Sequence, residues 1–244
     1  YHSLWRATGQ PGQGAIPAAA ANCNQSTVGG MRFSQQTAPA KSYLAYLEAV
    51  SSTSASTMEV HDRLMDRGGL NGTLTTAQPV GLDVNGVTAD NMAERIGDAN
   101  YSDIQWWLEW YADTGATVTT ATVAVTYNDG TTGNLTGVSL AATRRASFMQ
   151  PLNGLIPAAA AGKFIRAVNT VALSASTGTA GNFGVTATRL RGTLFMPIAN
   201  AKFSADWANL PISTIPNSAC PFIAVLASTT STGLLRGGGK IAHG

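Results

Sequence analysis

The sequence predicts an all-β protein, an antiparallel β-sandwich of the jelly-roll type with at most one or two short helices. Three features favour this class: apolar residues that alternate along short runs, segments rich in β-branched residues, and Gly/Ser/Thr-rich breaks between the runs. The breaks recur at spacings of roughly 8 to 12 residues, which is typical of sandwiches. We expect an extended N-terminal arm over residues 1–26 and a single β-sandwich domain over residues 27–244.

The N-terminal arm is predicted because the segment from Leu4 to Asn22 has no sustained period of 2 or 3.6 residues. It contains two prolines and three glycines, which interrupt regular structure. Its large apolar side chains, Leu4, Trp5 and Ile16, are too few to form a core of their own. We therefore expect them to pack on a neighbouring surface at a subunit interface.

Beyond residue 27 one pattern occurs four times: a strand-like run, a polar break and a second strand-like run. The expected strand pairs are 42–50 with 58–65, 103–112 with 117–127, 163–173 with 183–196, and 221–227 with 234–242. We interpret each pair as a hairpin, which gives eight strands. A further strand is expected over 135–140, after a tight turn at 128–130 whose Asp-Gly step suits positive φ angles.

The segment 104–111 is the strongest strand prediction, because large apolar residues alternate with a second set along it. The first set is expected in the core and consists of Ile104, Trp106, Leu108 and Trp110. The second set includes Trp107 and Tyr111, which are expected to face outward at a subunit interface. Alternatively, these aromatic rings form a platform on which a sugar stacks.

One short helix is expected, with Thr88 or Asp90 as its N-cap. It continues through the residues NMAERI and ends at Gly97, which can adopt the left-handed conformation that follows many helices.

The charge content is unusually low for a folded chain. Of 244 residues, 44% are hydrophobic and 11% are charged, whereas ordinary domains carry roughly 25% charged residues. The hydrophobic content excludes disorder, and the net charge of +2 gives no broad attraction to nucleic acid. No apolar run approaches the ~20 residues of a membrane-spanning helix, and no secretory leader is expected.

Threonine and serine replace charged residues on the strand faces, for example at Thr120, Thr122, Thr126, Thr186 and Thr188. Hydroxyl groups cost less to desolvate than charged groups, so another subunit can cover such faces without trapping an unpaired charge. The composition therefore favours an assembly subunit, and we expect a homo-oligomer.

No catalytic, cofactor-binding or metal site is predicted, and we expect no enzyme. Motifs of serine hydrolases, zinc proteases, P-loops and dinucleotide-binding folds are absent. His61 and Asp62 point to opposite faces of a strand, so His61 is expected at the surface or an interface and not as a catalytic base. Cys23 and Cys220 are expected to be small buried hydrophobes.

The sequence has one acidic stretch and two basic clusters that could bind a ligand. The acidic stretch lacks the spacing of a calcium loop, so solvated loop and cap roles are expected for Asp83, Asp90, Glu94, Asp98 and Asp103. The basic clusters, Arg144-Arg145 and Arg236 to Lys240, are expected to be solvated or at an interface, because they are not interleaved with aromatic residues.

Several segments resemble structural proteins of tailed bacteriophage virions. They are LWRATGQPGQGAIP at 4–17, HDRLMDRGGLNGT at 61–73, WWLEWYADTGATVTTATVAVTY at 106–127 and SASTGTAGNFGVTATR at 174–189. The resemblance implies a virion component with a β-sandwich fold, located at the capsid surface or head–tail region and assembled in the host cytoplasm. No catalytic residue is carried over from it.

The function expected from this resemblance is that of a capsid decoration (cement) or auxiliary head subunit. It would bind the major capsid protein or other virion proteins and stabilise the shell by mass action. The alternative is a tail or fibre receptor-binding module that recognises surface carbohydrate. A glycan-cleaving enzyme is a third hypothesis, and it requires paired acids across a cleft.

Overall fold

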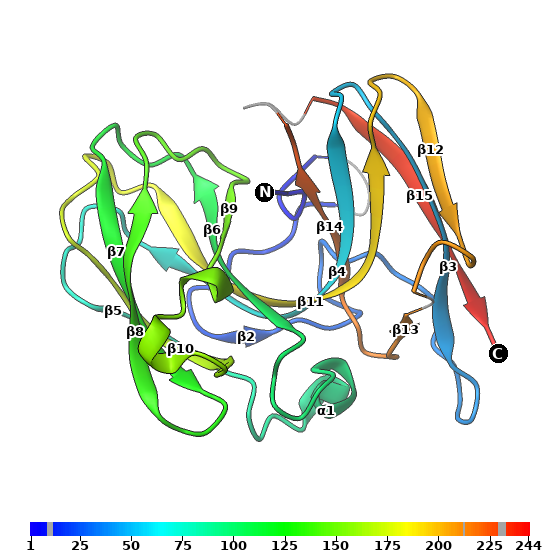
Figure 1. Ribbon diagram of the computed structural model, residues 1–244, viewed down its shortest axis with the longest axis horizontal. Coiled ribbons are helices and arrows are strands. Elements are labelled where there is room, and N and C mark those ends of the chain that lie inside the picture. The colour runs from blue at the N-terminus through cyan, green and yellow to red at the C-terminus, as the bar shows by residue number, and fades with distance from the viewer. Residues whose placement is uncertain (9–11, 212, 229–232) are drawn as a thin grey trace. The chain divides into compact units, whose positions relative to one another are not determined.

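A computed structural model describes residues 1–8, 12–211, 213–228 and 233–244. The chain is nearly all β, its sheets are antiparallel, and the predicted β-sandwich class is confirmed. Figure 1 shows its strands. Within the described residues, no helix is both long enough and apolar enough to cross a bilayer.

The chain divides into two compact units, each with its own hydrophobic core. The first unit contains Tyr1–Gly14, Asn24–Arg63 and Leu190–Gly244, and the second contains Ala15–Cys23 and Leu64–Arg189. Residues of the expected arm therefore belong to both units. The predicted division into an arm over 1–26 and a single domain over 27–244 stays a prediction. The two compact units divide the chain at other positions.

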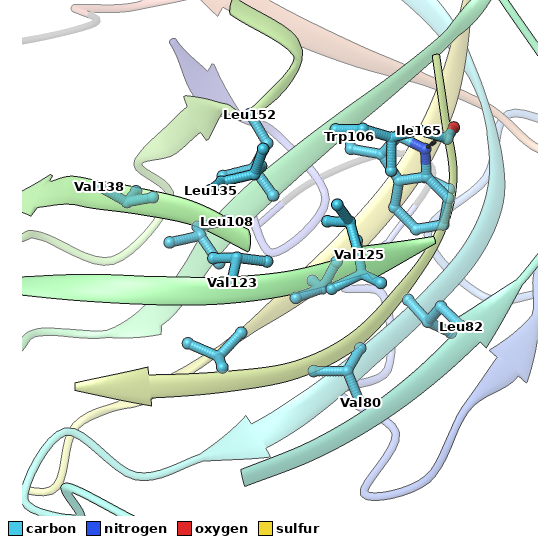
Figure 2. Packing of buried hydrophobic residues seen from close by; sticks show 14 of the residues in the cluster. Val80, Leu82, Trp106, Leu108, Val123, Val125, Leu135, Val138, Leu152 and Ile165 are labelled. Carbon is cyan, nitrogen blue, oxygen red and sulfur yellow. Dashed lines mark hydrogen bonds between the residues drawn. The ribbon is translucent and has the colours of Figure 1, made fainter. Parts of the chain in front are cut away.

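The second unit holds the larger core. One of its sheets has the order β5 (Gln78–Asp83), β10 (Ile165–Leu173), β7 (Thr119–Tyr127) and β8 (Thr132–Leu140). Its other strands are β6 (Ile104–Ala112), β9 (Met149–Pro151), β2 (Ala21–Asn22) and the second-unit parts of β4 (Ser56–Leu70) and β11 (Asn182–Met196). Figure 2 shows side chains packed in this core, where the Trp106 indole Nε1 donates to the Ile165 carbonyl oxygen at 2.8 Å.

The first unit has a smaller core. Its first sheet is built around β3 (Ser42–Ser51), which pairs with β12 (Lys202–Asp206), β13 (Thr214–Ile215) and β15 (Leu235–His243). Its second sheet has the order β1 (His2–Ser3), β14 (Pro221–Leu226), β4 and β11. Leu44 and Leu47 of β3 pack in one cluster with Met58 of β4 and Met196 of β11, so this core lies between the two sheets.

The eight expected strands are present, but the four expected hairpins are wrong. Both strands of each pair exist, yet they lie in different sheets: β3 and β4, β6 and β7, β10 and β11, and β14 and β15. Sheets in a sandwich pack about 10 Å apart, and a polar break can span that gap as readily as it can form a turn. Alternation identifies a strand with one buried face, but it does not say which strand lies beside it.

The hairpin of β7 and β8 agrees with the predicted tight turn and the predicted extra strand. Gly130 has a φ of 83°, and its N–H donates to the Tyr127 carbonyl oxygen at 3.0 Å. β8 then pairs antiparallel with β7, from Thr132 opposite Thr126 to Leu140 opposite Thr119.

The expected short helix is present as α1 (Met92–Arg95), preceded by the 3₁₀ turn η1 (Ala89–Asn91). Gly97 follows it with a φ of 83°, as predicted. Thr88 lies at the N-cap position of η1, as predicted, but its side chain makes no capping hydrogen bond. Asp90 is not an N-cap, because it lies inside η1 with a left-handed φ of 57°, and the N-cap of α1 is Asn91. Two further 3₁₀ turns are η2 (Asn153–Leu155) and η3 (Ala158–Ala160).

Candidate functional site

The two faces of β6 differ as the alternation predicts, but both are buried. Trp106, Leu108 and Trp110 lie in the core of the second unit. On the opposite face, Trp107 is 3% exposed and its Nε1 donates to Thr188 Oγ1 at 2.8 Å. The prediction that Trp107 and Tyr111 face outward is therefore wrong within this chain, and the Trp107 ring is no platform for a sugar.

Part of the covering of this face comes from Ile16, and the contact depends on a glycine. Gly68 of β4 lies under both Ile16 and Tyr111: a Cβ at this position would overlap Ile16 Cγ2 and would lie 3.0 Å from Tyr111 Cε2. The Gly68 N–H donates to the Pro17 carbonyl oxygen at 2.8 Å. The structure thus brings together two of the predicted interface residues, Ile16 and Tyr111, inside one chain.

Glu109 lies on the same covered face and is 1% exposed. Its Oε2 accepts hydrogen bonds from Thr186 Oγ1 at 2.6 Å and from the Tyr111 hydroxyl at 3.1 Å. Hydrogen bonds to a charged acceptor are stronger than neutral ones, which allows a carboxylate to be buried. Thr186 and Thr188 are fully buried. Their hydroxyl groups therefore lie inside the chain, whereas an outer strand face was expected for them.

In the first unit, a cluster of aromatic and cationic side chains surrounds Trp5. The Arg63 guanidinium carbon lies 4.3 Å from the Trp5 ring centroid and 5.4 Å from that of Phe222. Trp5 and Phe222 meet edge to face at 6.1 Å. His61 lies 5.8 Å from Phe222 and is 1% exposed. The expectation that His61 lies at the surface is wrong, because this face of β4 is covered.

His61 and Asp62 point apart, as a strand requires. His61 Nε2 lies 2.9 Å from Glu59 Oε2. Asp62 instead pairs with Arg191 Nη2 at 3.1 Å and accepts the Cys220 N–H at 2.9 Å. Asp62 and Arg191 are both almost fully buried. This ion pair joins β4 to β11, and Arg191 Nη1 also donates to the Thr214 carbonyl oxygen.

The five predicted interface residues are largely covered by their own chain. Trp5, Trp107 and Tyr111 are buried, whereas Leu4 and Ile16 are partly exposed. Their role in contacts between subunits stays a prediction. The two cysteines, Cys23 and Cys220, are buried thiols that form no disulfide, as expected.

Two carboxylates of the acidic stretch are paired with arginines. Asp83 pairs with Arg166 at 3.2 Å, and Asp103 pairs with Arg189 at 3.0 Å. Throughout the described residues, no three His, Cys, Asp or Glu side chains are placed to hold a metal ion.

One basic cluster does contact aromatic residues, contrary to expectation. The guanidinium carbon of Arg144 lies 4.3 Å from the Phe148 ring centroid, and burial lowers the pKa of Arg144. The sequence does not interleave these residues, but the loop around 141–151 folds Arg144 back onto Phe148.

Sequence reasoning missed three exposed large apolar side chains of the first unit. Phe195 is 56% exposed, Ile198 is 61% exposed and Trp207 is 68% exposed. Alternation could have found Phe195, since Leu194 and Met196 on either side of it are buried in the core. Trp207 directly follows β12 and has no such signal in the sequence.

Comparisons with known proteins assign no family to this chain. No family model and no curated protein matches the sequence. A solved structure of a mutant VP2 protein of infectious bursal disease virus, from derived T=1 particles, aligns over 94% of this chain and 71% of that one. Its identity is 13% and its TM-score is 0.17, so this likeness carries no argument.

Proposed function

We propose that this chain is a structural subunit of a bacteriophage virion, a capsid decoration or auxiliary head protein that acts through subunit contacts. The observation that carries the proposal is that three large apolar side chains of the first unit, Phe195, Ile198 and Trp207, are each more than half exposed. Burial of such side chains against another protein removes their apolar surface from water, which favours association. Its partners would be the major capsid protein or other virion proteins, and further copies of this chain.

The energetics favour association through these side chains. Burial of apolar surface contributes about 25 cal/mol per Å², and a tryptophan buries about 150–250 Å². The low charge content of the chain, 11% of its residues, lowers the desolvation cost of contacts between subunits. A subunit that binds only the assembled shell stabilises that shell by mass action, without any chemical step.

The test uses virions that lack this chain, to which the purified protein is added back. We expect it to cosediment with the particles and to raise the temperature at which they release DNA. Trp207→Ser and Phe195→Ser should each weaken binding several-fold. Val118→Ser is the matched control, because Val118 is 65% exposed but belongs to the second unit. Equal particle stability with and without the bound protein would refute the proposal.

The second candidate function is that of a receptor-binding module of the tail or fibre. The observation that favours it is the exposure of the Trp207 ring. This ring is 68% exposed and directly follows the exposed carboxylate of Asp206, a combination that suits stacking and hydrogen bonding to a sugar. Glycan-array binding that Trp207→Ala abolishes, and that Trp207→Phe retains, would favour this candidate. Binding to capsids without binding to any glycan of the array would favour the decoration role.

A further inference from the structure

The first unit contains a cavity of about 950 Å³ between its sheets. Its walls are mainly apolar and come from both sheets, including Leu47 of β3, Met58 and Val60 of β4, Ile223 of β14 and Ile241 of β15. Ile223 and Ile241 are only partly buried against the core, so the apolar packing of this unit is incomplete on this side. Pockets of roughly 300–1,000 Å³ are the usual size for small-molecule ligands.

Glycines of β15 help to leave this space open. Gly237, Gly238 and Gly239 all line the cavity. A Cβ on Gly239 would lie 3.2 Å from Leu47 Cδ2, so this position faces the apolar wall formed by β3. Larger residues here would close part of the cavity, whereas glycine contributes no side chain to fill it.

The charge of the cavity is set by one residue. Among the described residues that line it, Arg32 is the one charged side chain. Arg32 is exposed, and none of the ion pairs within the described part of the chain includes it. An unpaired guanidinium beside an apolar cavity complements a ligand with an anionic head and an apolar body.

We propose that this cavity binds a soluble anionic amphiphile with a single alkyl chain, such as a fatty carboxylate. The alkyl chain occupies the space between the sheets, and the carboxylate accepts hydrogen bonds from Arg32. An alkyl chain needs no hydrogen-bonding partner, whereas an inserted peptide would bring an N–H and a C=O for every residue. Because Thr8 and Arg32 are the only polar side chains of the described lining, the alkyl chain is the better complement.

The test is isothermal titration calorimetry of the whole chain with dodecanoate, below the concentration at which dodecanoate forms micelles. We expect saturable binding of one dodecanoate per chain and a negative heat-capacity change, the mark of apolar burial. Dodecyltrimethylammonium has the same alkyl chain with the opposite charge, and we expect it to bind at least tenfold more weakly.

Two substitutions probe the two parts of the site. Arg32→Gln should weaken dodecanoate binding by about tenfold, the effect of losing one charge-assisted hydrogen bond. Arg236→Gln is its control, because Arg236 is exposed on β15 but does not line the cavity. Ile241→Trp should abolish binding by filling the cavity. Ile198→Trp is its control, at an exposed site of the same unit away from the lining.

Three results would overturn the proposal. The first is the absence of saturable dodecanoate binding to the folded wild-type chain. The second is equal affinity for the cationic and anionic amphiphiles. The third is self-association in sedimentation velocity that Ile241→Trp abolishes and dodecanoate does not compete with, because the cavity would then be an interface between copies. None of these readouts depends on capsid binding, so the two proposals fail separately.

Discussion

The guanidinium of Arg63 lies over the indole ring of Trp5, with its Cζ 4.3 Å from the ring centroid. Both side chains are almost fully buried. Trp5 comes from the N-terminal segment and Arg63 from β4, so this contact fixes the segment on a strand that is distant in sequence. A cation over the face of tryptophan is attracted by the ring's quadrupole, and the attraction strengthens when both groups leave water.

Trp5→Ala should lower the free energy of unfolding by about 3–5 kcal/mol, because it leaves a large cavity beside Arg63 and Phe222. Urea denaturation followed by circular dichroism measures the change. The matched control is Trp207→Ala, at a side chain that is 68% exposed, for which we expect a change within about 0.5 kcal/mol. Similar losses for both variants would contradict the assignment of Trp5 to the interior.

Gly68→Ala should lower the free energy of unfolding by about 1–3 kcal/mol, the usual cost of overpacking. The added methyl group would overlap Ile16 Cγ2 and press on the Tyr111 ring. Ile16→Ala in the same chain should recover part of that loss, which a double-mutant cycle by urea denaturation measures. Gly154→Ala serves as control, because nothing lies within 4 Å of a Cβ there. Strict additivity of the two substitutions would argue against the contact.

Asp62→Asn should destabilise the first unit by about 3–5 kcal/mol, because Arg191 would stay buried without its counter-charge. The comparison variant is Asp103→Asn, which removes the partner of Arg189 at a site that is 43% exposed. There we expect a loss of no more than about 1 kcal/mol, because solvent screens exposed ion pairs. Thermal unfolding of the two variants in parallel gives the difference, and equal losses would refute a special role for the buried pair.

The carboxyl group of Asp129 should titrate well below the ordinary aspartate range. Lys163 Nζ lies 2.8 Å from its Oδ2, and the Thr131 side chain and backbone N–H donate to its Oδ1; these contacts lower the pKa. Since the folded pKa is depressed, the stabilisation is present above the unfolded pKa of about 3.9 and is lost as the pH falls through the folded value.

Carbon-13 NMR of the Asp129 carboxyl group across an acid titration measures this pKa directly. Lys163→Met should raise it toward the ordinary value, and Thr131→Val should raise it further in the same chain. A wild-type Asp129 that titrates like a free aspartate would show that the Lys163 contact does not persist in solution.

The sequence by itself determined the strands and their buried faces. The alternation of Trp106, Leu108 and Trp110 identified a core face, and the Asp-Gly step identified the turn between β7 and β8. Both signals are local: a side chain points to one face or the other because of the strand's period of 2, and a tight turn requires positive φ at fixed positions.

Only the tertiary structure decided which strands lie side by side and what covers their outer faces. In each expected hairpin, the two strands lie in different sheets. The side chains of Trp107, Tyr111 and His61 are buried, although an exposed position was expected for each. The residues involved in covering these faces, such as Trp5 and Ile16, are far from them in sequence, and their contacts depend on Arg63 and Gly68. A local pattern shows which face of a strand a side chain lies on. Contacts with residues distant in sequence decide whether that face is exposed to water or covered by protein.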